Sequence, residues 1–233
     1  MLESGLAELG IRVTDEMLGR FDKFADLLRT RSEETNLTAI KDPAEIARLH
    51  FIDSAAPLAL FDFSDKSVID IGAGAGFPGL AIKLASPETK ITLLDSRQKR
   101  VDFLNEAARH LELFDVSAVC GRAEELSAKG KEYRESFDIA ISRAVAALPV
   151  LCELCLPFVK LGGVFIAMKG PEPEEEIAAS SNAIKKLGGV LYKTEKYNLP
   201  GTEIGRSCVI IRKETNTPDT YPRRFAKITK LPL

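Results

Sequence analysis

Short apolar runs alternate with segments of helical periodicity along most of this 233-residue chain, and this alternation limits the possible folds more than any other feature. The runs have the length and composition of buried strands, whereas a segment such as 97–111 repeats apolar residues along one helical face. The pattern predicts a doubly wound α/β fold built on a parallel sheet. The runs that support it are 68–71, 91–95, 116–120, 137–142 and 163–168.

The last part of the alternating pattern departs from a purely parallel arrangement. Two further strand-like runs, at about 190–197 and 206–212, follow a predicted helix near 173–187 and are joined only by the loop NLPGTEIG. A crossover between parallel strands needs about a dozen residues or more, so the last strand is expected to run antiparallel. The sequence therefore predicts a seven-stranded, Rossmann-like sheet with a reversed last strand, whereas dinucleotide-binding domains usually repeat parallel units.

Residues 1–62 are predicted to form a helical segment that packs on a main domain formed by residues 63–233. Thr14 can cap a helix, and Asp42 precedes a proline and an N3 glutamate in a second capping pattern. With 45% hydrophobic residues, a chain of this length can bury one substantial core. The apolar stripe of the first capped helix comprises Leu18, Phe21, Phe24, Ala25 and Leu28.

The charges and cysteines narrow the class of protein further. The 32 basic and 34 acidic residues nearly cancel, so nothing indicates a global basic surface for nucleic acid. Cys152 and Cys155 are spaced as C-x-x-C, but they lie in the apolar stretch VLCELCLPFV and are expected in the core. A metal or redox centre is the less favoured alternative, because no second pair of ligands is evident. We expect a cytoplasmic protein with no membrane span and no metal.

The glycine-rich segment VIDIGAGAGFPG predicts a ligand site at the carboxyl edge of the sheet. Gly74, Gly76 and Gly79 match the G-x-G-x-x-G pattern of dinucleotide sites, and Asp95 follows about 20 residues later. A carboxylate at Asp70, however, would cost up to roughly 4 kcal/mol per charge pair about 4 Å from a pyrophosphate. The same carboxylate attracts the positive groups of S-adenosylmethionine, which the sequence therefore favours over NAD. Asp70 could alternatively bond the loop amides.

Acidic residues also follow the second and third strand runs. Asp95 ends the second run, where a carboxylate can accept hydrogen bonds from both hydroxyls of the ribose that either cofactor offers. Glu124, preceded by Ala123, could lie beside an adenine ring or could belong to the solvated start of a helix. The acidic run PEPEEE at 171–176 is expected to begin a helix rather than to bind a ligand.

An ordered set of motifs resembles the glucose-inhibited division protein B family, bacterial methyltransferases that modify N7 of a guanine in small-subunit ribosomal RNA. The motifs are VIDIGAGAGFPG, LLDS, KRVDFL, GRAEE, ISRA, YPRRFAKITKLPL and, upstream, NLT and RLHFIDS. The resemblance implies the methyltransferase fold, S-adenosyl-L-methionine as cofactor, and ribosomal RNA or a ribosomal particle as partner. The implied cofactor contacts are Gly72, Phe77, Ala123, Glu124 and Arg143, supported by Gly74 and Asp95.

Methyl transfer to guanine N7 needs no catalytic base, because N7 presents a lone pair and loses no proton. Catalysis then depends on the placement of the reactants, and we assign no catalytic residue. Lys169, at the end of the fifth run, is a candidate substrate contact. In the tail at 218–233, four basic residues oppose one acidic residue, so Tyr221, Arg223 and Arg224 are candidate RNA contacts. We expect the enzyme to be a monomer.

Several alternatives remain open at this point. Arg143 could form a structural ion pair, and His50 and Asp53, three residues apart on a predicted helix, could bond each other. Ala226 and Ile228 stand where the family commonly has Gly and Pro, which leaves the backbone path of the tail open. The protein could also methylate a small molecule or a protein, act on a dinucleotide as an oxidoreductase or redox sensor, or bind its partner without catalysis.

Overall fold

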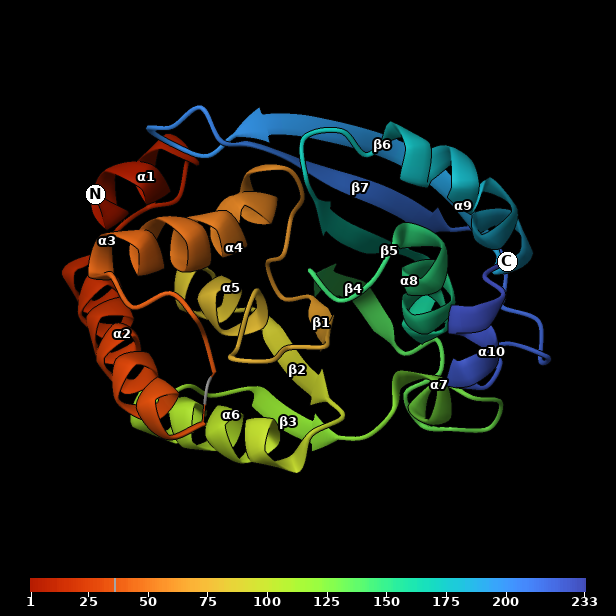
Figure 1. The fold of residues 1–233 in the computed structure, drawn as a ribbon, viewed down its shortest axis with the longest axis horizontal. Coiled ribbons are helices and arrows are strands. Elements are labelled where there is room, and N and C mark those ends of the chain that lie inside the picture. The colour runs from red at the N-terminus through yellow and green to blue at the C-terminus, as the bar shows by residue number, and fades with distance from the viewer. Residues whose placement is uncertain (36) are drawn as a thin grey trace.

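The computed structural model describes residues 1–35 and 37–233, so Asn36 of the NLT motif lies outside the described residues. Within them, seven strands form one mixed sheet in the order β3-β2-β1-β4-β5-β7-β6 (Figure 1). Neighbouring strands from β3 to β5 pair in parallel, and β7 is antiparallel to both β5 and β6. The strands are β1 (Ser67–Ile71), β2 (Lys90–Asp95), β3 (Val116–Cys120), β4 (Phe137–Arg143), β5 (Val159–Lys169), β6 (Gly189–Asn198) and β7 (Gly205–Lys213).

The predicted α/β sheet with a reversed last strand is confirmed. The reversal has a local cause, because only residues 199–204 connect β6 to β7 and so short a connection cannot cross over the sheet. The clearest difference from the prediction is β5, which begins at Val159 rather than at residue 163. Its pairing with β4 shifts register between Phe137 and Ile139. This irregular start lies at the end of the sheet away from the glycine loop.

Helices cover both faces of the sheet, with α1 to α6 on one face and α7 to α10 on the other (Figure 1). Each face buries its own hydrophobic cluster. The helical elements are α1 (Leu2–Glu8), α2 (Asp15–Thr35), α3 (Pro43–Glu45), η1 (Ile46–Ile52), α4 (Asp53–Ala55), η2 (Ala56–Ala59), α5 (Gly79–Ala85), α6 (Gln98–His110), α7 (Ala123–Leu126), α8 (Leu148–Cys155), η3 (Leu156–Phe158), α9 (Glu174–Lys186) and α10 (Phe225–Lys230).

The N-terminal helices follow from local capping and an apolar stripe. Thr14 Oγ1 accepts a hydrogen bond from the Met17 amide at 3.2 Å, and Phe21 and Phe24 are fully buried in the cluster that also covers one face of the sheet. Asp42 caps α3 by accepting from the Glu45 amide at 2.9 Å. The helix then widens into the π-helical turn η1, which the sequence did not indicate. Residue 62, the expected boundary, lies in the connection between η2 and β1, and the division into two domains stays a prediction.

The cysteine pair occupies the second core cluster, as predicted. Cys152 and Cys155 lie on α8 with no exposed surface, and burial raises the pKa of the Cys152 thiol to about 12. Both thiols are therefore protonated and packed as small apolar side chains.

Each helix among the described residues is either too short or not apolar enough to span a bilayer.

Candidate active site

The glycine loop connects β1 to α5 at the carboxyl edge of the sheet. Gly72, Gly74 and Gly76 have φ values of +80°, +57° and +94°, in the left-handed region that favours glycine. A Cβ atom on Gly72 would lie 2.5 Å from Cγ2 of Val145, whereas a Cβ atom on Gly74 would meet no atom closer than 3.8 Å. The loop therefore needs glycine both for its backbone path and for the close approach of the segment after β4.

Asp70 does not face the ligand site, so its expected attraction for a positive ligand is not supported by its position. The side chain is fully buried, and its Oδ2 accepts a hydrogen bond from the Gly79 amide at 2.8 Å. Its Oδ1 has no hydrogen-bond partner among the described residues. Burial raises the pKa of this carboxyl to about 7. Asp70 thus holds the loop to the start of α5, the alternative role considered above, because packing under the loop excludes ligand and solvent.

Asp95 ends β2 and fixes the opposite side of the loop. Its Oδ2 accepts from the Gly74 amide at 3.0 Å and from Arg100 Nη1 at 3.2 Å, while its Oδ1 accepts from the Arg97 amide at 2.9 Å. A carboxylate offers about four acceptor positions, so these contacts leave room for a hydroxyl. The side chain lines a cavity, and these donors fix its orientation.

The first cavity, about 410 Å³, is formed by the carboxyl ends of β1 to β4 together with α7, α8 and α10. Gly74 lies beside it through its bond to Asp95. The Phe77 side chain does not line it, because that ring is buried between the N-terminal helices and stacks on His50. Of the residues expected at the cofactor, those that line the cavity are Gly72, Asp95, Ala123, Glu124 and Arg143.

The lining of the first cavity combines a surface that suits a nucleoside with a group of positive charges. Ile71, Leu94 and Leu154 provide apolar surface beside the Asp95 carboxylate, which suits a base and a ribose diol. Among the described residues that line the cavity, basic side chains outnumber acidic ones. This excess of positive charge suits a ligand that carries a carboxylate. The apolar lining and the oriented Asp95 carboxylate therefore fit S-adenosylmethionine. The cationic residues are Arg97, Arg100, Arg122 and Arg143.

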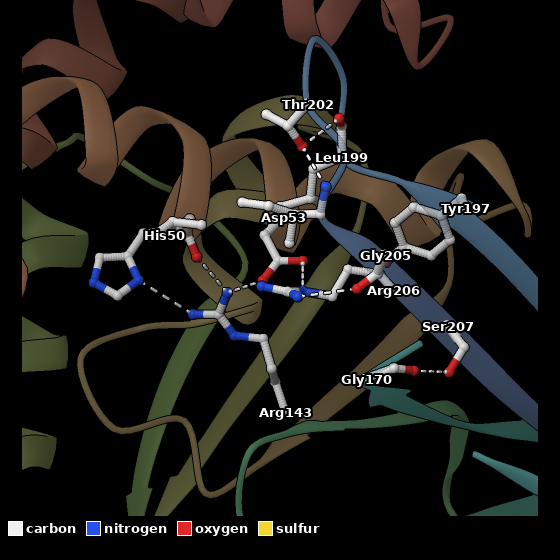
Figure 2. A network of polar contacts seen from close by, with 12 residues as sticks. His50, Asp53, Arg143, Gly170, Tyr197, Leu199, Thr202, Gly205, Arg206 and Ser207 are labelled. Carbon is white, nitrogen blue, oxygen red and sulfur yellow. Dashed lines mark hydrogen bonds and ion pairs between the residues drawn. The ribbon is translucent and has the colours of Figure 1, made fainter. Parts of the chain in front are cut away.

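A network of ion pairs joins the N-terminal helices to the sheet edge (Figure 2). Asp53 on α4 accepts from Arg143 Nη1 at 3.1 Å and from Arg206 Nε at 3.2 Å. Arg143 also donates to the Leu49 carbonyl at 3.0 Å. Arg143 therefore forms the structural ion pair considered as an alternative and lines the first cavity as well. Asp53 and Arg206 were not predicted as site residues from the sequence. Asp53 is separated from Arg143 by about 90 residues and from Arg206 by about 150, so no local pattern connects them.

His50 is part of this network through Thr38 and Arg143, and not through the bond to Asp53 that was one of the alternatives. Its Nε2 lies 2.7 Å from Thr38 Oγ1, and its Nδ1 faces Arg143 Nη2 at 3.4 Å (Figure 2). Burial and the nearby Arg143 charge lower the pKa of His50 to about 4. The imidazole is therefore neutral near pH 7. Since Arg143 can only donate, Nδ1 accepts and the proton resides on Nε2.

A second cavity, about 450 Å³, adjoins the first across Arg143 and Ala144, which line both. Ala144 has a φ of +56°, so the ridge between the cavities is a strained backbone position. Lys169 lines the second cavity, but its Nζ donates to the Ala146 carbonyl at 2.9 Å and pairs with Glu176 at 2.8 Å. The remaining lining residues are Ile40, Leu49, His50, Asp53, Met168, Gly170 and Arg206.

The acidic run at 171–176 and the basic tail are connected to the core more closely than predicted. Glu176 lies near the start of α9 as expected, yet it also accepts from the Leu148 amide at 2.6 Å.

Arg223 in the basic tail was expected at RNA phosphates, but its Nε and Nη2 donate to the Glu153 carboxylate at 2.6–3.1 Å. Glu153 is fully buried, so this pair anchors the tail to α8. Arg224 is exposed and Tyr221 is half-buried.

The tail ends in the short helix α10 at the positions where the family pattern is broken. Ile228 is fully buried in the second core cluster, and Ala226 is exposed. The helix brings Phe225 to the first cavity, which the sequence did not indicate. The sequence shows only that Phe225 is an aromatic residue next to basic ones. Its position at the first cavity depends on how α10 packs.

A larger cavity, about 590 Å³, lies at the other end of the strands and is lined by Arg12, Phe61 and Glu88 among others. It contains none of the residues expected at the cofactor, so the two smaller cavities form the candidate active site. The described residues include no cluster of three or more His, Cys, Asp or Glu side chains that could hold a metal ion.

Solved structures of other proteins share the fold of this chain. Solved structures with the same fold include PhzM, with a TM-score of 0.56 at 17% identity over 72% of this chain and 56% of that chain. Another is M. jannaschii TYW2 in complex with AdoMet, with a TM-score of 0.53 at 15% identity over 69% of this chain and 74% of that chain. At these identities the likeness shows the fold alone.

Relatives of much higher identity cover the whole chain. Ribosomal RNA small subunit methyltransferase G of Acetivibrio thermocellus is 45% identical over 233 residues, covering 100% of this chain and 96% of the relative. The protein of the same name from Clostridium kluyveri is 44% identical, covering 100% and 98%. The GidB family, described as rRNA small subunit methyltransferase G, matches residues 17–204. This chain therefore belongs to the GidB family of rRNA small subunit methyltransferases.

Proposed function

We propose that this enzyme transfers the methyl group of S-adenosylmethionine to N7 of a guanine in small-subunit ribosomal RNA. The observation that carries this proposal is the pair of cavities that meet at Arg143 and Ala144 in a chain of the GidB family. A methyl donor in one cavity and a base in the other would meet at this ridge. Methyl transfer requires such a close and fixed approach of the two reactants.

The first cavity would hold the cofactor, which supplies an electrophilic methyl group when bound. Asp95 would accept the ribose hydroxyls, and its existing bond to the Gly74 amide would keep the carboxylate in place. Gly72 lets the loop approach closely, because a side chain there would collide with Val145. Ala123 and Glu124 line the part of the cavity next to β3 and would contact the adenine ring.

The second cavity would hold the guanine. Met168 and Leu49 provide apolar surface for the faces of a base, and the Arg206 guanidinium provides donors for an acceptor such as O6. Asp53 orients Arg206 through Nε at 3.2 Å. The same carboxylate orients Arg143, so one residue of the N-terminal segment positions side chains on β4 and β7. The N-terminal segment is therefore part of the proposed substrate site.

No side chain has to remove a proton in this reaction. Guanine N7 carries a lone pair, and the base gains positive charge as the new bond forms. His50 is neutral and already bonded to Thr38 Oγ1, so it serves to hold Arg143 rather than to act as a base. The chain's contribution is to orient both reactants and to exclude water from the ridge at Ala144.

The RNA surface would include the exposed part of the basic tail. Arg224, Lys227 and Lys230 are exposed and form no ion pair with a described residue. They could neutralise phosphates, whereas Arg223 is committed to Glu153. We also propose that the enzyme acts in the cytoplasm as a monomer, on ribosomal RNA or on a ribosomal particle.

The decisive experiment supplies the purified enzyme with methyl-labelled S-adenosylmethionine and small subunits that lack the modification. We expect one labelled nucleoside, 7-methylguanosine, identified by mass spectrometry after digestion. A transcript in which 7-deazaguanosine replaces guanosine should accept no label, because it lacks the N7 nucleophile. Label on another nucleoside, or tight calorimetric binding of NAD without S-adenosylmethionine, would refute the proposed function.

A pair of variants on β7 tests the assignment of the second cavity. Arg206→Ala should lower methyl transfer strongly while leaving cofactor affinity unchanged, because Arg206 lines only the second of the two cavities. Arg212→Ala is the matched control, since Arg212 lies near the other end of β7 and packs over the Tyr192 ring at 3.8 Å. Equal activity of the two variants would exclude Arg206 from the substrate site.

A further inference from the structure

Phe225 occupies an unusual position on the C-terminal helix. Its side chain is 40% exposed and lines the first cavity together with Ala123 and Glu124. A single exposed aromatic residue is ordinary on a protein surface and implies no function by itself. Here, however, the ring stands at a cavity with an oriented carboxylate at Asp95. Its anchoring and its neighbours therefore determine whether it can contribute to binding.

The segment that carries Phe225 is held on both sides. Two residues before it, Arg223 donates to the buried Glu153 carboxylate through its backbone amide at 2.8 Å and through its guanidinium. Three residues after it, Ile228 is fully buried in the core. Leu154, next to Glu153 on α8, lines the same cavity as Phe225. The ring is thus held in place by packed elements of the protein itself, which lowers the entropic cost of using it as a contact.

Arg122 provides a second constraint on the ring. Its guanidinium carbon lies 5.5 Å from the centroid of Phe225, within the range of a cation–π contact. Arg122 precedes α7 and also lines the cavity. The ring therefore contacts the segment that follows β3 at the lining of the cavity, and the contact restricts the orientation of the ring.

The order of the strands determines which part of the cofactor would reach Phe225. β3, β2, β1 and β4 are consecutive in the sheet, with Asp95 at the end of β2 and the ridge at Ala144 after β4. If Asp95 binds the ribose, the methyl group must point toward β4, where the second cavity begins. The adenine, attached to the other side of the ribose, must then point toward β3, which is followed by Arg122 and Ala123, and Arg122 contacts Phe225.

We propose that Phe225 is a cofactor-binding residue that contacts the adenine ring by stacking, an inference that rests on the proposed function. The C-terminal helix then closes the adenine end of the cofactor cavity. The same helix presents Lys227 and Lys230 to solvent. The tail would thus contribute to the cofactor site as well as to the RNA surface.

The chain contains no tryptophan, so Phe225→Trp creates a single tryptophan reporter at the proposed contact, which can be excited apart from the tyrosines. Titration with S-adenosylhomocysteine, or with adenosine alone, should change its emission in a saturable manner, because adenine would stack on the indole. Phe114→Trp is the matched control. Phe114 is 80% exposed and precedes β3, at the opposite end of that strand from Arg122, so its emission should not respond.

Affinity measurements test the same contact without a reporter. Base–aromatic stacking predicts that Phe225→Ala raises the Kd for S-adenosylhomocysteine about fivefold or more, whereas Phe225→Tyr retains the wild-type Kd. Melting curves on the same preparations verify that both variants are folded. A silent Phe225→Trp reporter in a protein that binds S-adenosylhomocysteine by calorimetry would overturn the adenine contact and leave the proposed function intact. Failure of the wild-type protein to bind S-adenosylhomocysteine would overturn both.

Discussion

Replacing Arg223 with alanine tests whether the tail arginine anchors the fold or binds RNA. Glu153 is fully buried and receives three donors from Arg223, its backbone amide at 2.8 Å, Nε at 2.9 Å and Nη2 at 2.6 Å. Arg223→Ala keeps only the backbone donor and leaves a buried carboxylate without its counter-charge. Removing one partner of a buried ion pair costs about 3–5 kcal/mol of unfolding free energy.

The cost is large enough to measure by thermal unfolding. For a chain of this size, each kcal/mol lowers the melting temperature by about 2–4 °C, so Arg223→Ala should melt about 6–20 °C below the wild type. Thermal scans followed by circular dichroism measure the effect.

Arg224→Ala provides the matched control and the opposite expectation. Arg224 is exposed, so its removal should change the unfolding free energy by no more than about 0.5 kcal/mol. If it contacts an RNA phosphate, the slope of log affinity against log salt should become shallower by roughly 0.7–0.9. Arg223→Ala should leave that slope unchanged. A shallower slope together with an unaltered melting temperature for Arg223→Ala would refute the anchoring role.

Three further substitutions test the cofactor loop. Burial raises the pKa of Asp70 in the folded state from 3.8 to about 7. This carboxyl therefore stabilises the fold most at low pH, where it is protonated. Up to about 4 kcal/mol of unfolding free energy is lost as the pH rises through this range. Urea unfolding of Asp70→Asn should not show this decline, and pH profiles parallel to the wild type would contradict it. Asp95→Ala should weaken cofactor binding by roughly 1.5–3 kcal/mol in calorimetry, and unchanged affinity would exclude Asp95 from the ribose. Gly72→Val should abolish cofactor binding, because its Cβ would lie 2.5 Å from Val145 in a left-handed backbone conformation, and normal binding would place the pocket elsewhere.

The architecture follows largely from local sequence features. Strand and helix periodicities predicted the alternating elements, and the short connection at 199–204 predicted the reversed strand, since chain length alone forbids a crossover there. The positive φ values at Gly72, Gly74 and Gly76 agree with a loop that only glycine tolerates well. These features depend on residues close in sequence, so they can be recognised before the tertiary structure is known.

The partners of charged side chains could not be recognised in this way. Arg223 had an apparent role at RNA phosphates, but its acidic partner Glu153 lies 70 residues earlier. Asp70 was expected to face a ligand, and packing under the loop instead removed it from solvent. Local sequence shows which residues carry charge, whereas burial and distant neighbours determine what that charge contacts.

The proposed substrate site shows the same division. Asp53, Arg143 and Arg206 come from α4, β4 and β7, and no periodicity or spacing connects them. Their meeting depends on how the N-terminal helices pack against the carboxyl edge of the sheet (Figure 2). The sequence by itself determined the fold class, the glycine loop and the family resemblance. Only the tertiary structure decided which charges pair and which cavities meet at Ala144, because those contacts arise from packing between elements far apart in the chain.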